Sequence, residues 1–346
     1  MIAFFSFAFR QISSNAFCLI LLCLITFGCL TKPKESIVEE VPQSIQTIET
    51  SPQKTSTTTR RPLLLSTDSG KSWQDAAPSL PENIQASFIV KIDKELLLAS
   101  DNLGVFISSG NKAKWTAINE GLPNLKINAL LVVENTIYAG VYRKGIYQWS
   151  NQENAWTSIN TNLPDLKVQC LHQTDNHLLA GTDSGVFKLD PTSKTWFSTD
   201  LKAQVLSIYE SHGKLIAGTS QGTALSTDKG ANWRWIRQEG AVHYTLLNNT
   251  RIIELAINGD LVYSDDWGST WRQIDYGPNG DSYVYDLVEL EDRQFLSNNY
   301  GIHVSTNQGE QWELTFPTER MAFFDLLVEG SVLYGSTRAW DEFRGR

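Results

Sequence analysis

After residue 62 the chain alternates between short apolar runs and polar turns, and this order repeats many times. Residues 97–107 begin with leucines and alanine, turn at Asp-Asn-Leu-Gly and end in Val-Phe-Ile; similar segments follow at 137–147, 178–188 and 215–225. Short aliphatic and aromatic runs bounded by Gly, Asp and Asn are typical of β-hairpins. No long segment has the 3.6-residue periodicity of a helix. The pattern therefore predicts an all-β protein.

Tryptophan recurs at a nearly constant interval through the same region. Neighbouring landmarks are 37 to 42 residues apart: Trp73, Trp115, Trp156, Trp196, Trp233, Trp271 and Trp312. Four short strands in a unit of about forty residues are typical of a β-propeller blade. The seven landmarks predict a seven-bladed β-propeller with four antiparallel strands per blade, A to D from the axis outward.

The two ends of this region complement each other. Residues 62–66 form an apolar run directly before a tryptophan, as a C strand would, with no A or B strand before it. Residues 321–328 and 332–336 have the pattern of A and B strands, with no tryptophan turn after them. We therefore expect a propeller over residues 62–346 whose N- and C-terminal strands share one blade, which leaves no open sheet edge.

Four of the tryptophans end a shared frame, S-x-[DN]-x-G-x-x-W. Its members are Asp68, Gly70 and Trp73; Asp228, Gly230 and Trp233; Asp266, Gly268 and Trp271; and Asn307, Gly309 and Trp312. Asp and Asn can hydrogen-bond their own backbone two residues on, and Gly adopts positive φ without strain. Each frame therefore predicts the turn from strand C to strand D. One carboxylate per turn is too few for calcium, so these residues are predicted to be structural.

The frame resembles the Asp-box, also called the bacterial neuraminidase repeat, over about residues 62–346. Sialidases carry this repeat and hydrolyse glycosides, but their Arg-Ile-Pro motif is missing here. Xyloglucan-type endoglucanases use two such propellers, and this chain supplies one. The chain looks more similar to sortilin-like and photosystem-assembly-factor-like propellers, which implies a binding or assembly scaffold for a protein or glycan. Because one fold hosts many functions, this expectation is an analogy.

One face of such a ring gathers the D–A and B–C loops, and we call it the upper face; the A–B and C–D turns form the lower face. Aromatic and basic residues predicted for the upper face are Tyr142, Arg143, Tyr276, Tyr283, Tyr300, Arg320, Arg338 and Trp340. Exposed Tyr, Trp and Arg are favoured at binding hot spots. The alternative is that these loops are simply polar and that the aromatic residues cap strand ends.

The sequence specifies no catalytic site. Asp286 and Asp325 fall at one equivalent position of adjacent A strands. They could form a functional carboxylate pair, or equally accept backbone amides or hold channel water. Glycoside hydrolysis normally needs two carboxylates facing a cleft, for which Asp281 and Glu319 are further candidates. A glycoside hydrolase acting on surface polysaccharide is therefore the alternative to a non-enzymatic scaffold.

Other features exclude partners rather than suggest them. The histidines have no metal-ligand spacing and no glycine-rich phosphate loop precedes a helix, so we expect neither a metal nor a cofactor. The chain has 38 acidic and 29 basic residues, a net charge of −9. This balance argues against nucleic acid and against direct docking on anionic lipid. We expect a monomer.

Residues 1–28 resemble a signal peptide, with Arg10 before the apolar run 16–28. The run ends at Gly28 and Cys29, which resembles a lipoprotein signal-peptidase site. We therefore expect lipid on Cys29, a flexible polar tether over 29–61, and an outer-membrane lipoprotein of the cell envelope. An ordinary secretory signal followed by a chance cysteine is the alternative.

Overall fold

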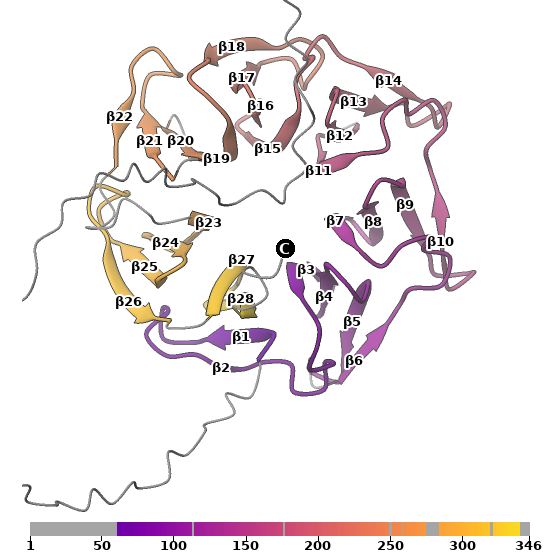
Figure 1. Ribbon diagram of the computed structural model, residues 1–346, viewed down its shortest axis with the longest axis horizontal. Helices are drawn as coiled ribbons and strands as arrows, with labels where there is room; N and C mark the ends of the chain where they lie inside the picture. Colours follow the sequence, from indigo (N-terminus) through magenta and orange to yellow (C-terminus); the bar gives the residue numbers. More distant parts are fainter. Residues whose placement is uncertain are drawn as a thin grey trace, which may run out of the picture. The chain divides into compact units, whose positions relative to one another are not determined.

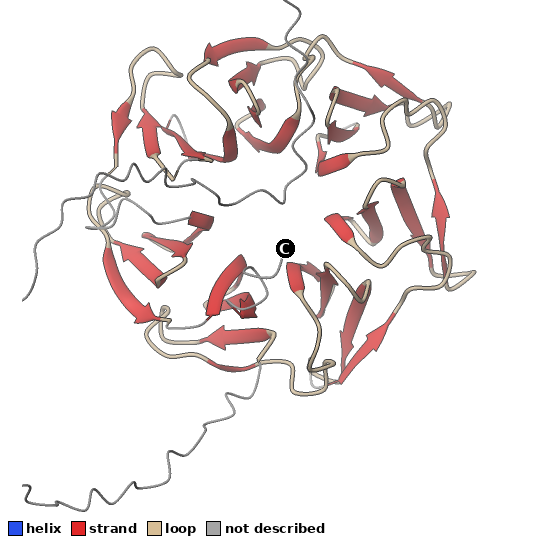
Figure 2. Cartoon of the chain, in the orientation of Figure 1, coloured by secondary structure: helices blue, strands red, loops and turns tan. Residues whose placement is uncertain are grey.

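The computed structural model describes residues 61–112, 114–175, 177–248, 251–257, 259–274, 284–318 and 321–339. Within these ranges every regular element is a strand, and the strands form seven four-stranded antiparallel sheets (Figure 2). The sheets stand around a central axis as the blades of a propeller (Figure 1). The predicted seven-bladed, all-β fold is confirmed. The predicted signal peptide, Cys29 and nearly all of the tether lie outside the described residues.

Each blade has strands A to D from the axis outward, and we number the blades around the ring. Blades 2, 3 and 4 consist of β3 (Ala86–Ile92), β4 (Glu95–Ser100), β5 (Val105–Ser109) and β6 (Lys114–Ala117); β7 (Ile127–Val133), β8 (Thr136–Val141), β9 (Gly145–Ser150) and β10 (Ala155–Ser158); and β11 (Val168–Gln173), β12 (Leu178–Thr182), β13 (Gly185–Leu189) and β14 (Trp196–Ser198). Blades 5, 6 and 7 consist of β15 (Val205–Ser211), β16 (Lys214–Thr219), β17 (Gly222–Ser226) and β18 (Arg234–Arg237); β19 (Val242–Asn248), β20 (Arg251–Ala256), β21 (Leu261–Ser264) and β22 (Arg272–Gln273); and β23 (Val284–Leu290), β24 (Arg293–Asn298), β25 (Gly301–Ser305) and β26 (Glu313–Pro317).

Blade 1 closes the ring with strands from both ends of the described chain. Its order from the axis is β27 (Met321–Glu329), β28 (Val332–Ala339), β1 (Leu63–Ser66) and β2 (Gln74–Asp75). Leu63 pairs with Ser336, and Ser66 pairs with Leu333. The predicted shared blade and its pairing are therefore confirmed.

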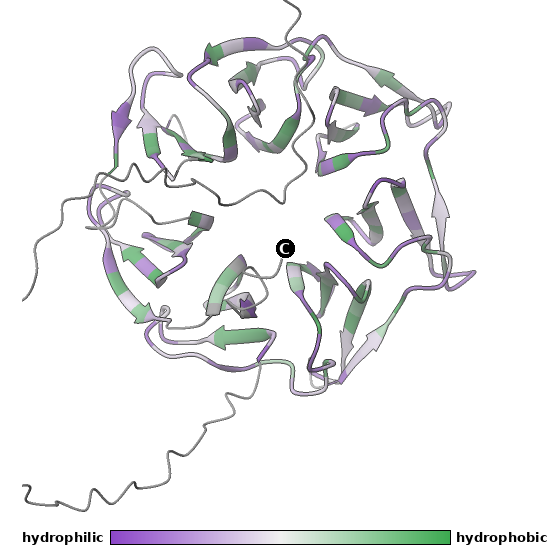
Figure 3. Cartoon of the chain, in the orientation of Figure 1, coloured by the Kyte–Doolittle hydropathy of each residue, from purple (hydrophilic) through white to green (hydrophobic). Residues whose placement is uncertain are grey.

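The hydrophobic core lies between neighbouring blades. Leu63 of blade 1 and Leu96 and Leu98 of blade 2 are fully buried and belong to one cluster. Similar clusters fill the other gaps between blades. Figure 3 shows β1 as mostly hydrophobic, as a strand buried on both faces requires. Among the described residues, no helix has the length and hydropathy needed to cross a membrane.

The Asp-box turn is held by two side chains acting together. Ser66 Oγ accepts the N–H of Gly70 at 2.9 Å and donates to Asp68 Oδ1 at 2.8 Å. The same Asp68 oxygen accepts the N–H of Ser72 at 2.9 Å. The prediction that the carboxylate bonds two residues on is thus wrong in detail: it reaches four residues on. The reason is that Ser69 and Gly70 both have positive φ, which folds the chain back toward the carboxylate.

The tryptophans fall into two groups. In the four boxes the indole N–H caps its own turn, as Trp73 Nε1 donates to the carbonyl of Gly70 at 3.0 Å. The other boxes repeat this contact at 3.1 to 3.3 Å. Outside the boxes, Trp156 Nε1 donates to Ile118 of the preceding blade at 2.5 Å. Trp196 Nε1 likewise donates to the carbonyl of Ile159 at 2.6 Å, so these two tryptophans join neighbouring blades. The indole N–H of Trp115 is buried without a hydrogen-bond partner among the described residues.

Candidate functional site

The four described residues of the predicted binding face lie on three different blades. Tyr142 and Arg143 lie in the B–C turn of blade 3, Tyr300 lies in that of blade 7, and Arg338 lies in β28 of blade 1. The remaining four predicted residues, Tyr276, Tyr283, Arg320 and Trp340, lie outside the described residues. Blades 1 and 2 separate blade 7 from blade 3 in the ring (Figure 1). The two tyrosine turns are therefore separate surfaces.

On blade 3, Tyr142 is held between two cations. Its N–H donates to the carbonyl of Lys126 at 2.9 Å, which fixes the B–C turn against the D–A loop. The Lys126 ammonium lies 4.9 Å from the ring centroid, and the Arg143 guanidinium lies 5.2 Å from it. Arg143 itself is exposed, with φ +55°. The turn thus presents an aromatic ring and an exposed guanidinium together at the upper face.

A chain of ion pairs links this turn to blade 1. Lys126 Nζ lies 3.0 Å from Asp101 Oδ1, and Arg338 Nη1 lies 3.8 Å from Asp101 Oδ2. Arg338 Nε also donates to the carbonyl of Ala86 at 2.7 Å, and Nη2 donates to the hydroxyl of Ser87. With only 14% of its side chain exposed, Arg338 ties blade 1 to blade 2. Its guanidinium is occupied by the protein itself.

Two exposed leucines next to Tyr142 were missed by the sequence analysis. Leu125 and Leu166 are 38% and 39% exposed and end the D–A loops that lead into blades 3 and 4. Their carbonyls accept the N–H groups of Gly104 at 2.8 Å and Gly145 at 3.0 Å, so each loop is fastened to the preceding blade. A repeated Leu-Pro-x-Leu-Lys segment, present at 122–126 and 163–167, is the sequence pattern that could have revealed these two leucines.

These residues form one amphipathic surface at the upper ends of blades 3 and 4. We call it the leucine–lysine patch, and its members are Leu125, Lys126, Tyr142, Arg143, Lys144, Leu166 and Lys167. It carries four cationic side chains. Three acidic groups adjoin it: Asp101, which pairs with Lys126; Asp183, 3.2 Å from Lys167; and Asp165, which accepts the N–H of Lys167 at 3.0 Å. The patch is thus basic on a chain whose net charge is −9.

Tyr300 has a different environment. It is partly buried, its N–H donates to Asn298 Oδ1 at 2.8 Å, and its carbonyl accepts the N–H of Thr318 at 2.8 Å. No described cation lies over its ring, in contrast to Tyr142. Its role in binding stays a prediction.

The seven A strands share a β-bulge, and one side chain follows the bulge in each blade. These equivalent residues are Phe88, Ala129, Cys170, Ser207, Tyr244, Asp286 and Asp325. Asp286 and Asp325 thus occupy one equivalent position, as predicted from the sequence. They lie on the innermost strands, β23 and β27, of neighbouring blades.

Each aspartate accepts one backbone N–H of the next blade, and Asp286 also accepts one from its own strand. Asp286 Oδ2 accepts the N–H of Leu326 at 2.7 Å, and its Oδ1 accepts the N–H of Leu287 at 2.8 Å. Asp325 Oδ2 accepts the N–H of Ile89 at 2.7 Å. These hydrogen bonds give both carboxylates a structural role, because they link neighbouring blades. Asp281 and Glu319, the other carboxylates considered for glycoside hydrolysis, lie outside the described residues.

Burial dominates the titration of this pair. It raises the pKa of Asp286 to about 6, against hydrogen bonds from Leu326, Leu287 and the Tyr244 hydroxyl that favour the ionised form. Burial also raises the pKa of Asp325 well above its usual range, and the charge of Asp286 raises it further. Within the described residues, no group of three or more His, Cys, Asp or Glu side chains could hold a metal ion.

Comparison with known proteins supports the fold. No protein-family model matches the chain, and no curated protein matches it. Among solved structures it is similar to YCF48 bound to D1 peptide, with a TM-score of 0.60 and 13% identity over 75% of this chain and 93% of that one. YCF48 from Cyanidioschyzon merolae gives a TM-score of 0.57 and 13% identity over 76% and 98%.

A third similar structure is the extracellular domain described as that of a hybrid two component system, BT4673 from B. thetaiotaomicron. Its TM-score is 0.63 at 14% identity, and the match covers 74% of this chain but 38% of that one. The chain therefore spans well under half of that protein's length. At these identities the likeness establishes the seven-bladed propeller and no more.

Proposed function

We propose that this protein is a non-enzymatic binding module that holds a segment of another protein on its leucine–lysine patch. The observation that carries the proposal is the exposure of Leu125 and Leu166 beside the Tyr142–Arg143 turn. Exposed apolar side chains rimmed by polar ones mark interaction sites more often than isolated ones do. Tyr and Arg are also the residues most favoured at hot spots.

The chemistry of the patch describes its partner. Two leucines offer apolar contact for an aliphatic or aromatic side chain, and the four cations attract carboxylates. The complementary segment is therefore an extended peptide with acidic and apolar residues. Known structures support only the class of partner: YCF48, which has a similar fold, is described as bound to a peptide. The resemblance of the boxes to assembly-factor-like repeats points the same way.

The proposal includes an envelope location. Residues 1–28 would be removed as a signal peptide, Cys29 would carry lipid, and residues 29–61 would connect the propeller to the outer membrane. The support is the sequence Gly28-Cys29 after an apolar run. Replacement of Cys29 by Ser would then move the protein from the membrane to the soluble fraction. If that variant stays membrane-bound, lipid on Cys29 is not the anchor.

Peptide binding is tested with a displayed library of acidic and apolar peptides, followed by fluorescence anisotropy on the best binder. We expect Leu125→Ser and Leu166→Ser each to weaken binding about tenfold, as loss of 1.4 kcal/mol would. Arg143→Asn removes the cation while keeping a residue that tolerates positive φ. The matched control is Leu314→Ser, since Leu314 of β26 is 42% exposed and far from the patch.

Three results would contradict the proposal. The first is equal loss of binding in Leu314→Ser, and the second is full binding by Leu125→Ser and Leu166→Ser. The third is capture of glycans, but not peptides, by the wild-type protein on a glycan array. Hydrolysis of a chromogenic glycoside that is lost in Asp286→Asn or Asp325→Asn would instead establish the enzyme alternative.

A further inference from the structure

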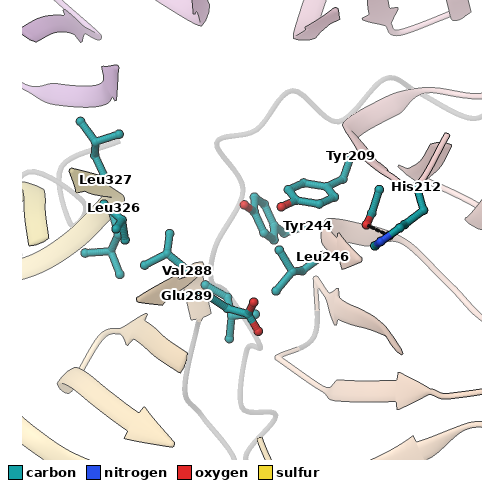
Figure 4. A pocket seen from close by; sticks show the side chains of 11 residues that line it. Tyr209, His212, Tyr244, Leu246, Val288, Glu289, Leu326 and Leu327 are labelled. Atoms are coloured by element: carbon teal, nitrogen blue, oxygen red, sulfur yellow. Dashed lines mark hydrogen bonds between the residues drawn. The ribbon is translucent and has the colours of Figure 1, made fainter. Parts of the chain in front are cut away.

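A cavity of about 460 Å³ opens in the wall of the axial channel (Figure 4). It is lined by the A strands of four consecutive blades, β15, β19, β23 and β27, and it reaches the A–B turn at Ser211 and His212. Its volume is within the range of small-molecule sites. The leucine–lysine patch lies on blades 3 and 4 at the opposite face, so this cavity is a separate feature.

The cavity exists because the ring is not evenly packed at its axis. Among the described residues, β19 and β23 are in weaker contact than the other neighbouring pairs of inner strands. Tyr244 of β19 bridges this gap, because its hydroxyl hydrogen-bonds to the Asp286 side chain of β23. Leu246 of β19 and Leu287 of β23 line the space that remains. The opening is therefore built into the arrangement of the blades.

The walls of the cavity differ in character. Figure 4 shows the rings of Tyr209 and Tyr244 next to each other on one side, with Leu326 and Leu327 on the far side. The aliphatic lining comes from β19, β23 and β27: Leu246, Leu287, Val288, Leu326, Leu327 and Val328. An aromatic wall facing an aliphatic one accepts a ligand with a flat or branched hydrocarbon body.

The cavity lining carries negative charge. Its described lining includes the carboxylate of Glu289 and the imidazole of His212, and neither Lys nor Arg. Gln294 Nε2 donates to Glu289 Oε1 at 2.8 Å, which orients the carboxylate. Burial raises the pKa of Tyr209, and the charges of Glu289 and Asp286 raise it further. The ring of Tyr209 therefore lies in a negative potential that repels anions.

We propose that this cavity binds a small organic cation with an apolar body, such as an aryl- or alkylammonium ion. The ammonium group would lie against the Tyr209 ring and near the Glu289 carboxylate, where cation–π and ionic attraction act together. The hydrocarbon body would lie against the aliphatic residues of β23 and β27, which removes apolar surface from water. This site and its ligand class go beyond peptide binding on the upper face.

Titration calorimetry of the full propeller tests the ligand class with three probes of nearly equal shape. We expect phenethylammonium to bind about tenfold more tightly than phenethyl alcohol, and 3-phenylpropionate to show no binding. The neutral probe isolates the contribution of charge, and the anionic probe reports the sign of the potential. Equal binding of all three probes, or no binding of phenethylammonium, would overturn the proposal.

Two variants locate the site. Glu289→Gln removes the charge from an exposed side chain while an amide oxygen can still accept from Gln294, and we expect phenethylammonium to bind about tenfold more weakly. Glu291→Gln is the matched control, because Glu291 is exposed in the A–B turn directly after β23 but does not line the cavity. Wild-type affinity in Glu289→Gln, or equal weakening in Glu291→Gln, would contradict a specific site. Circular dichroism melting verifies that both variants are folded.

A further variant separates this proposal from the first one. Leu125→Ser removes a residue of the leucine–lysine patch and leaves the cavity untouched. We expect it to lose peptide binding and to bind phenethylammonium like the wild type. Loss of both activities would indicate damage to the ring and would contradict the independence of the two sites.

Discussion

The carboxylate of Asp286 in β23 accepts the backbone N–H of Leu326 in β27 at 2.7 Å. This bond crosses from one blade to the next inside the axial channel, and Asp325 makes the equivalent bond to Ile89 of blade 2. An N–H group buried without an acceptor would cost about 1–3 kcal/mol. Two buried acids therefore help to hold blades 7, 1 and 2 in register.

The raised pKa of Asp286 predicts a specific pH dependence of stability. The carboxyl titrates near 3.8 in an unfolded chain and at about 6 in the folded protein. Its stabilising contribution is thus complete below the unfolded value and is lost as pH rises through about 6, by up to about 3 kcal/mol. We expect Asp286→Asn to flatten the fall in unfolding free energy between about pH 4 and pH 7, measured by urea unfolding.

Asp190→Asn is the control for this measurement. Hydrogen bonds from the N–H groups of Ser193 and Thr192 lower the pKa of Asp190. Its contribution is therefore present above the unfolded value and is lost as pH falls below it, the opposite sign. An unchanged slope in Asp286→Asn would show that its carboxyl is not the group that titrates.

The first serine of an Asp-box is predicted to stabilise the protein more than an exposed hydroxyl of the same turn does. Ser264 is 1% exposed, and its Oγ accepts the N–H of Gly268 at 2.8 Å and donates to Asp266 at 2.8 Å. We expect Ser264→Ala to lower the unfolding free energy by about 1 kcal/mol because the half-buried N–H of Gly268 loses its acceptor. The control is Ser269→Ala, which removes an exposed hydroxyl of the same turn. Similar urea midpoints for the two variants would disprove the assigned role.

Ring closure is predicted to depend on the short strand β1. Leu63 is fully buried between blades 1 and 2. We expect Leu63→Ala to destabilise the protein by about 2–5 kcal/mol, as removal of a buried leucine side chain does. Differential scanning calorimetry would show a lower melting temperature, whereas Leu314→Ala on the exposed face of β26 would leave it nearly unchanged. If both variants melt alike, the closing blade does not limit stability.

Removing one partner of the buried ion pair between blades 5 and 6 is predicted to destabilise the protein. Arg237 Nη1 lies 2.9 Å from Glu254 Oε2, and Glu254 is fully buried. We expect Arg237→Leu to cost about 3–5 kcal/mol, since it leaves a carboxylate unpaired in the core. The double variant Arg237→Leu/Glu254→Leu should recover most of that loss. An additive double-mutant cycle, measured by urea unfolding, would refute this coupling.

The fold could be predicted from the sequence because its landmarks are local. Each Asp-box places a serine, an Asp or Asn, a glycine and a tryptophan within eight residues, and the hydrogen bonds that close its turn join these residues to one another and to the turn backbone. Blade count follows from the tryptophan period. The pairing of residues 62–66 with 332–336 could be predicted because the first blade lacks strands A and B at one end of the propeller sequence and strands C and D at the other. This pattern is also visible in the sequence.

The site was predicted less well because exposure and neighbours are tertiary properties. Leu125 has the same residue type as the buried leucines of every blade, and only the ring geometry leaves it exposed. Arg338 has the residue type of a contact residue, yet its guanidinium is engaged by Asp101, Ala86 and Ser87. Tyr244 occupies the same post-bulge position as Asp286, and the contact between the two depends on how neighbouring blades pack.

The antiparallel pairing of β1 with β28 determines how the ring responds to mechanical force. The chain enters β1 at Leu63 and leaves β28 beyond Ser336. These two residues pair with each other at one end of the β1–β28 ladder. A load that separates the two flanking segments would therefore break the ladder one hydrogen bond at a time instead of shearing all of them together. Blade 1 is thus the place where tension would first open the propeller.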